Sequence, residues 1–186
     1  MNEKKCELQV SNQKAMVVFS DKALLKMLSA ISICTKEIGW HGEVTKIDTG
    51  IYEIQEVFLY PQIVDNTTIV CEKDGLEYGK WQQDLIVNNP KRADSLAFHG
   101  HSHVNMACFP SNVDKDLQED LIEMLPDDRF YIFLIVNKSL KQWWRVVDKE
   151  DGVLYTNALI VNNCLQEIVI EYDELVKINT EVENGF

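Results

Sequence analysis

The alternation of apolar and polar residues in the first third of the chain predicts short strands. Two β-like runs lie in residues 7–19, separated by turn residues. Residues 42–47 and 51–60 have the pattern of two hairpin strands, and residues 48–50 between them favour a tight turn. The β-branched residues of 67–72 predict a further strand.

Apolar residues recur at helical spacing in three places, which are residues 22–34, 76–87 and 113–125. Ser20 precedes the first of these helices and suits its N-cap, because its side chain can accept a hydrogen bond from a free N–H group of the first turn. The second helix is expected to end before Pro90, since the residue before a proline disfavours helical geometry.

The second half of the chain contains the strongest strand pattern. Residues 130–136 form a continuous apolar run, which is typical of a central strand that is covered on both faces. Residues 95–100 predict a short buried strand before it, and residues 141–148 and 152–161 predict a hairpin after it. Residues 168–172 fit either a strand or the start of a helix.

This mixed order of strands and helices predicts an α+β fold with a mixed central β-sheet flanked by helices. The 186 residues suit a single domain. We expect its core in about residues 15–162 and a C-terminal extension in residues 163–186.

Composition narrows the class of protein. The formal net charge of -12, with no basic stripe, argues against a nucleic-acid partner. No apolar stretch is long enough for a transmembrane helix and no signal peptide is recognisable, so we expect a cytoplasmic protein without a membrane partner. The five cysteines are odd in number and show no CxxC spacing, so they favour buried apolar packing over a disulfide framework.

Three of the four histidines, His99, His101 and His103, lie within five residues. Residues two apart in a strand point to the same side, so His101 and His103 can present their imidazoles to one point. Zinc commonly takes two imidazoles and a carboxylate and leaves a fourth position open. Asp114 is the nearest suitable carboxylate, and the loop between it and His103 is long enough to fold back.

Two alternatives to this ligand set stay open. By the same strand geometry His99 is also a possible ligand. Ser111 and Asp114 form a Ser-x-x-Asp pattern before an apolar helix, which is typical of a capping box. On this interpretation the cap competes with the metal for the carboxylate of Asp114.

A hydrolytic zinc site also needs a base that exchanges protons with water and with the leaving group. A glutamate that stands near the metal without binding it serves this purpose in other zinc hydrolases. Glu37 and Glu43 both lie in the early strand region and are the two residues considered for this role.

Residues 101–114 read HSHVNMACFPSNVD and resemble the H-x-H-P, six residues, S-x-x-D motif of the JAMM (JAB/MPN-plus) metalloproteases. The spacing matches throughout, and Cys108 also stands where the family often has a cysteine. Residues 37–42 and 56–62 resemble the family's catalytic-glutamate strand and the strand that follows it. Val104 departs from the motif, because the family usually has proline there. The glycine after Glu37 is also shifted relative to the family's usual E-x-x-G pattern, so Glu43 stays open as the alternative acid–base residue.

The resemblance, which covers roughly residues 20–136, implies a single JAMM/MPN-like domain of the prokaryotic or phage type. It implies that His101, His103 and Asp114 bind zinc, that Glu37 is the acid and base, and that Ser111 supports the oxyanion. The implied activity is zinc-dependent hydrolysis of a peptide or isopeptide bond in a protein or peptide substrate, with ubiquitin-like and sulfur-carrier proteins among the expected partners.

Two other functions are compatible with the same residues. The first is a JAMM-like fold that acts as a scaffold or protein-interaction module with little or no catalysis, although inactive relatives typically lack the ligands. The second is another metallohydrolase, such as a phosphoesterase or lactamase, which would need further ligands where this chain has only His41 outside the cluster. The sequence leaves the oligomeric state undetermined.

Overall fold

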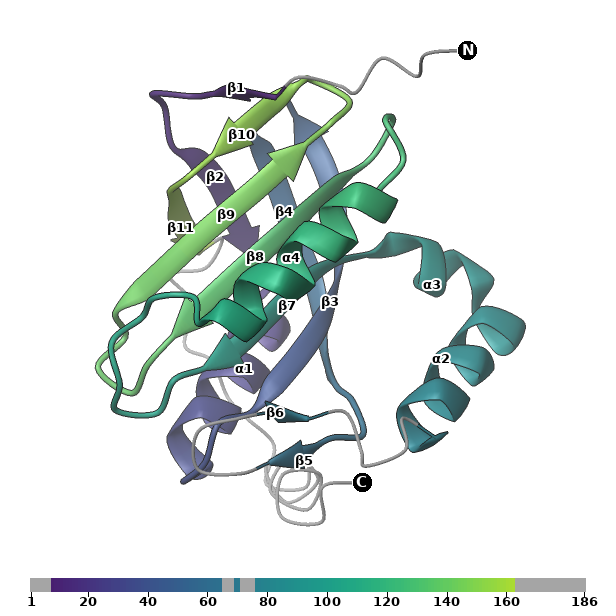
Figure 1. Cartoon of the computed structure of the whole chain (residues 1–186), viewed down its shortest axis with the longest axis vertical. Coiled ribbons are helices and arrows are strands. Elements are labelled where there is room, and N and C mark those ends of the chain that lie inside the picture. The colour runs from purple at the N-terminus through teal and green to yellow at the C-terminus, as the bar shows by residue number, and fades with distance from the viewer. Residues whose placement is uncertain (1–7, 65–68, 71–75, 163–186) are drawn as a thin grey trace.

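The computed structural model describes residues 8–64, 69–70 and 76–162, and their fold confirms the α+β expectation (Figure 1). Nine strands form one curled mixed sheet in the order β1-β10-β9-β8-β7-β3-β4-β2-β11. The strands of this sheet are β1 (Gln9–Val10), β2 (Ala15–Phe19), β3 (Gly39–Asp48), β4 (Ile51–Leu59), β7 (Leu96–Ser102), β8 (Phe130–Val136), β9 (Gln142–Asp148), β10 (Val153–Tyr155) and β11 (Ala158–Asn162). A separate pair consists of β5 (Ile63–Val64) and β6 (Ile69–Val70). The extension expected in residues 163–186, with the undecided element at 168–172, lies outside the described residues.

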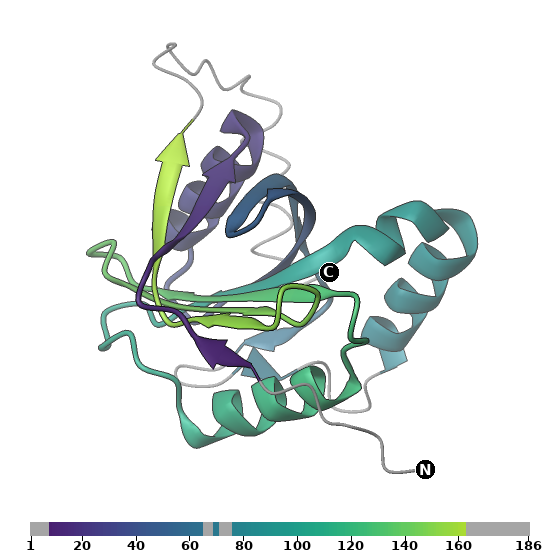
Figure 2. The same ribbon diagram turned by 90° about the horizontal axis from the view of Figure 1, so that it is seen from above.

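The described helices are α1 (Asp21–Ile33), α2 (Leu76–Asn88), α3 (Pro90–Ser95) and α4 (Asn112–Met124). Helices α1 and α4 lie on opposite faces of the sheet (Figure 2). The apolar stripe of α1 includes Met27 and Ile31 and packs into the main core together with Phe19, Trp40 and Phe98. Within the described residues no helix is long and apolar enough to span a membrane.

Most elements begin and end near the predicted residues, because their signals are local. The predicted hairpin is confirmed as β3 and β4, which pair antiparallel. Ser20 caps α1 by accepting a hydrogen bond from the backbone N–H of Ala23 at 3.1 Å. The apolar run of β8 is central in the sheet, between β7 and β9.

The structure departs from the expectation in two places. Helix α2 ends at Asn88, before Pro90, as expected, but the chain then forms a helix that was not predicted, α3, which begins at Pro90 because proline is well suited to the first position of a helix. The expected hairpin partner at 152–161 is divided: β10 pairs with β9, whereas β11 crosses to the opposite edge of the sheet and pairs in parallel with β2. Strand β11 pairs with a strand that is more than a hundred residues away in the sequence, so no local turn signal predicts its position.

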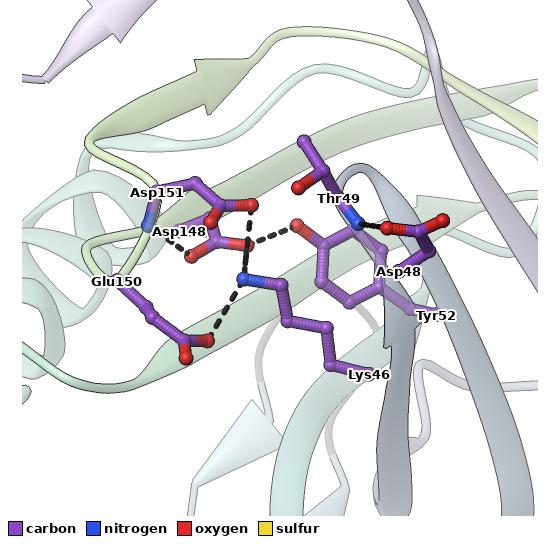
Figure 3. A network of polar contacts seen from close by, with 7 residues as sticks. All are labelled: Lys46, Asp48, Thr49, Tyr52, Asp148, Glu150 and Asp151. Atoms are coloured by element: carbon purple, nitrogen blue, oxygen red, sulfur yellow. Dashed lines mark hydrogen bonds and ion pairs between the residues drawn. The ribbon is translucent and has the colours of Figure 1, made fainter.

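A partly buried ion cluster joins the β3–β4 hairpin to the turn after β9 (Figure 3). The Nζ atom of Lys46 lies 2.9 Å from Asp148, 2.8 Å from Glu150 and 2.9 Å from Asp151. Asp148 is fully buried and also accepts a hydrogen bond from the hydroxyl of Tyr52 at 2.6 Å. Burial by itself would lower the pKa of Lys46, but hydrogen bonds to the three carboxylates outweigh it and raise that pKa above the usual range.

The loop after β7 begins with a strained residue. Val104 has a φ of 45°, which is a rare conformation for a β-branched side chain and costs on the order of 1–3 kcal/mol. Backbone hydrogen bonds on both sides hold this conformation, since His103 N–H donates to Val136 at 2.8 Å and Lys138 N–H donates to Val104 at 2.7 Å. The loop is therefore tethered to the end of β8.

Replacing Lys46 by Met should lower the free energy of unfolding by about 3 kcal/mol, because it leaves three carboxylates without their cation while it keeps most of the apolar stem. Urea unfolding followed by circular dichroism measures the change. Lys80→Met is the matched control, since the side chain of Lys80 is 59% exposed and its ion pair with Glu77 lies within one helix, and it should cost less than about 0.5 kcal/mol. Equal losses in the two variants would contradict a stabilising role for the Lys46 cluster.

Replacing Val104 by Pro should destabilise the protein by about 2–3 kcal/mol, even though it restores the residue that the JAMM motif favours. Proline fixes φ near −65°, and the loop requires a positive value. Val104→Gly should stay within about 1 kcal/mol of the wild type, because glycine adopts positive φ freely. Thermal unfolding compares the two variants, and a Pro variant as stable as the Gly variant would show that the strained conformation is not required.

Candidate metal centre

Strand β7 brings His101, and His103 just after the strand, to one end of the sheet. His99 and His101 lie on the face that α4 covers, because side chains alternate along the strand and Phe98, directly before His99, points into the core beneath α1. His103 follows the last residue of the strand and continues the pairing with β8. The rings of His101 and His103 are 4.9 Å apart between centroids, and both residues are buried.

Asp114 enters the site from the first turn of α4. Its Oδ1 atom lies 3.4 Å from Nε2 of His101, and its Oδ2 atom lies 3.9 Å from Nε2 of His103. One ligand atom from each of the three residues falls within 4.8 Å of the others. Ligands bound to zinc at 2.0–2.2 Å in a tetrahedron stand roughly 3.3–3.6 Å apart, so this donor set fits a zinc ion after small adjustments.

The expected capping box is present at Asp114, and it leaves one carboxylate oxygen facing His101. Oδ2 of Asp114 accepts a hydrogen bond from the backbone N–H of Ser111 at 2.7 Å, and Oγ of Ser111 accepts one from the N–H of Asp114 at 3.2 Å. The second carboxylate oxygen still faces His101. A carboxylate has two oxygens with several acceptor positions, so it can cap the helix and face the histidines at the same time.

The tautomer of His103 is set by the loop that follows it. Its Nδ1 atom lies 2.8 Å from the carbonyl oxygen of Ala107, which can only accept a hydrogen bond, so Nδ1 carries the proton. In the neutral ring the lone pair is then on Nε2, which faces Asp114. A backbone carbonyl behind a histidine is the usual arrangement at metal sites, because it orients the ring and makes it a better ligand.

Asn137, which was not among the predicted site residues, organises the loop that follows His103. Its side chain donates to the carbonyl of Met106 at 2.8 Å and accepts from the N–H groups of Ser139 and Lys141. The thiol of Cys108 donates to the carbonyl of Lys141, which fits the packing role expected for that residue. The only sequence signal for Asn137 is an amide directly after the apolar run of β8.

Glu37 precedes β3 and is held beside the histidines by that strand's pairing with β7. Gly39 is in register with His101, and Ser102 exchanges two hydrogen bonds with Ile38: its N–H donates to the Ile38 carbonyl at 2.9 Å, and its Oγ accepts from the Ile38 N–H at 3.2 Å. Glu37 is only 5% exposed.

Gln62 fixes the start of β3 from the other side. Its side-chain oxygen accepts from the N–H of Gly39 at 2.7 Å, and its amide donates to the Gly39 carbonyl at 2.9 Å. A side chain at Gly39 would collide with Tyr60, whose hydroxyl oxygen would lie 2.1 Å from the added Cβ. Ser102 and Gln62 position Glu37 through its neighbours, and neither residue belongs to a sequence pattern that would have marked it.

Glu43, the rival of Glu37, lies further along β3 and pairs with different residues. It is in register with Leu96 at the start of β7, and the Nε atom of Arg92 lies 2.7 Å from its carboxylate. His101 and His103 lie at the opposite end of β7. The structure therefore brings Glu37, and not Glu43, to the three proposed ligands.

His99 is also placed away from the convergence point. It lies on the same face as His101, but its ring is 6.3 Å from that of His101 and 5.1 Å from that of His41 on β3. It is absent from the group of side chains whose ligand atoms converge. Burial lowers the pKa of His99 to about 4 and that of His41 to about 3, so both rings are neutral at physiological pH.

The electrostatics of the site suit metal binding and proton exchange. Burial lowers the pKa of His101, which keeps its imidazole neutral and able to donate a lone pair. Burial alone would raise the pKa of Asp114, but His101 and the hydrogen bonds of Ser111 lower it, so the carboxylate is charged. Burial raises the pKa of Glu37 above its usual value, with an opposing contribution from His103. A glutamate shifted in this direction is closer to the pKa that acid–base catalysis requires.

Comparisons with known proteins add a likeness in fold. No protein-family model matches the chain, and neither does any curated protein. The chain is similar to the solution structure of protein DSY2949 from Desulfitobacterium hafniense, a target of the Northeast Structural Genomics Consortium. The likeness covers 82% of this chain and 96% of that one, with a TM-score of 0.50 and 18% sequence identity. At this identity it shows a shared fold alone.

Proposed function

We propose that the protein is a zinc-dependent peptidase or isopeptidase of the JAMM type, in which His101, His103 and Asp114 hold the ion. The observation that carries this proposal is the convergence of two imidazole Nε2 atoms and one carboxylate within 4.8 Å, with the buried Glu37 near enough that His103 and Asp114 both influence its pKa. Neutral imidazoles and a charged carboxylate are the protonation states that zinc requires.

Zinc bound at such a site polarises a carbonyl and makes water acidic enough to supply hydroxide near neutral pH. Glu37 accepts the proton from the attacking water and returns it to the leaving nitrogen, and its raised pKa suits both transfers. Its burial keeps bulk water from competing for that proton.

We propose that Ser111 stabilises charge during the reaction. Its Oγ atom accepts from the N–H of Asp114, which leaves the hydroxyl hydrogen available for donation. A donor that is held in place before the reaction stabilises an oxyanion without reorganisation. The capping box therefore serves the proposed chemistry as well as the helix.

Exposed apolar side chains beside the site support a peptide or protein substrate. Phe109 is 70% exposed and Met106 is 41% exposed in the loop between the ligands, and Val113 is 68% exposed in the first turn of α4. Apolar side chains that gather on a surface commonly mark a place where another chain binds. A protein or peptide, with ubiquitin-like and sulfur-carrier proteins among the classes to test, is the proposed partner.

Replacing His101 by Ala should reduce the zinc content of zinc-loaded, desalted protein from about one ion per chain to less than about 0.1, because two remaining ligands hold the ion weakly. Elemental analysis by mass spectrometry measures this ratio. His99→Ala is the matched control, two residues away on the same strand, and should keep its zinc. Loss of zinc in the His99 variant together with retention in the His101 variant would overturn the proposed ligand set.

Replacing Glu37 by Gln should leave zinc bound and lower turnover at least about 100-fold, because the amide cannot accept the proton. Cleavage is detected as new termini, by mass spectrometry of a peptide and isopeptide library incubated with zinc-loaded protein. Glu43→Gln makes the same change on the same strand and should retain activity within about threefold. If Glu37→Gln stayed active and Glu43→Gln lost activity, Glu43 and not Glu37 would be the acid–base residue.

A further inference from the structure

A second cavity lies on the α4 face of the sheet, away from the metal centre. It has a volume of about 220 Å³ and lies between α2 and α4, with His41 of β3 and Tyr131 of β8 contributing to its lining. Its residues do not include the three proposed ligands or Glu37. The proposed hydrolytic function does not use it.

Aromatic rings dominate one wall of this cavity. Tyr78 and Trp81 of α2 stack with centroids 5.7 Å apart and planes inclined by 23°, and Trp81 stacks on His41 at 5.8 Å and 13°. The polar ends of this wall are paired, because the Nε2 atom of His41 lies 2.9 Å from the hydroxyl of Tyr78. The cavity therefore offers flat ring faces and edges, which another ring can contact in an offset or edge-to-face arrangement.

The remaining walls carry no charge. Leu85 and Leu121 contribute aliphatic surface, and the amide of Gln82, an exposed residue, supplies a hydrogen-bonding group. Among the described residues, none of those that line the cavity is Asp, Glu, Lys or Arg. A charged ligand would lose hydration without gaining a partner here, so the walls select an uncharged one.

The volume limits the size of the occupant. A dry apolar cavity of about 150 Å³ holds benzene in a well-studied engineered protein, whereas sites for drug-sized molecules span about 300–1,000 Å³. At about 220 Å³ this cavity suits one ring or one fused ring pair.

Helix α2 has an incompletely packed apolar face. Tyr78, Trp81 and Leu85 recur at helical spacing and all line the cavity, yet no residue of α2 is fully buried. A ring placed between this face and Leu121 of α4 would remove apolar surface of both helices from water.

We propose that the cavity between α2 and α4 is a binding site for a single uncharged aromatic ring system, supplied either as a small free compound or as an aromatic side chain of a peptide. The stacked rings of Tyr78, Trp81 and His41 recognise its face and edge. The aliphatic side chains of Leu85 and Leu121 enclose it. This site is independent of zinc.

Titration of the zinc-free full chain with indole, followed by two-dimensional amide and indole N–H NMR, tests the proposal. Saturable chemical-shift changes are expected at Tyr78, Trp81 and Leu121. The expected Kd is on the order of 0.1–1 mM, because a ligand with so few atoms makes few contacts. Cyclohexylmethanol and the charged phenylacetate should bind at least about tenfold more weakly. Equal binding of the aliphatic alcohol, or no saturable shift with indole, would overturn the proposal.

Variants that fill the cavity provide the second measurement. Leu85→Trp, from α2, and Leu121→Trp, from α4, should each weaken indole binding by about tenfold or more, because the new side chain occupies the space. Gln83→Trp places the same residue at an exposed position of α2 and should leave binding unchanged. Circular dichroism verifies folding, and unchanged indole binding in a folded Leu85 or Leu121 variant would refute this location.

Capped peptides distinguish the two sources of the ring. N-acetyl-tryptophan amide and a capped glycine-rich peptide with one tryptophan are titrated beside their leucine counterparts. Binding of the tryptophan peptide with the affinity of indole supports a side chain as the occupant, and binding of indole alone supports a free compound. Because zinc and cleavage take no part in these titrations, their failure would leave the proposed hydrolytic function untouched, and the reverse also holds.

Discussion

The antiparallel pairing of β3 with β7 is the constraint on which the candidate metal centre depends. The three proposed ligands come from one short stretch of chain, but Glu37 reaches them only because Gly39 stands opposite His101 and Ser102 binds Ile38. A Cβ atom at Gly39 would strike the hydroxyl of Tyr60, so a larger residue there would force a shift. Backbone pairing, and not side-chain chemistry, thus places the proposed acid–base group.

The same end of the sheet collects buried polar groups that satisfy one another. Gln62 binds both backbone groups of Gly39, Asn137 binds three backbone groups around the loop, and Asp114 caps α4 while it faces His101. Each bond removes a group that would otherwise be buried without a partner. The result is a site with its proposed ligands oriented in advance, and the strained backbone of Val104 is part of the loop that orients them.

Much of the fold followed from local pattern. The caps and apolar spacing of α1, the hairpin of β3 and β4, and the apolar run of β8 each depend on residues that are close in the sequence, so they were predicted near their observed bounds. Two elements were not predicted. Helix α3 begins at Pro90, directly after the expected end of α2, and β11 pairs with β2, which is far away in the chain. A distant partner leaves no periodic signal that a single sequence displays.

The sequence by itself determined which atoms are available for chemistry: two imidazoles two residues apart, a carboxylate at fixed spacing, and two glutamates upstream. The tertiary structure decided which of them meet. It separated Glu37 from Glu43 by strand register, turned His99 towards His41, and let one carboxylate serve both cap and site. It also formed the aromatic cavity, whose residues come from six separate elements. Spacing along a chain constrains neighbours, whereas distances between remote residues depend on how strands pair and helices pack.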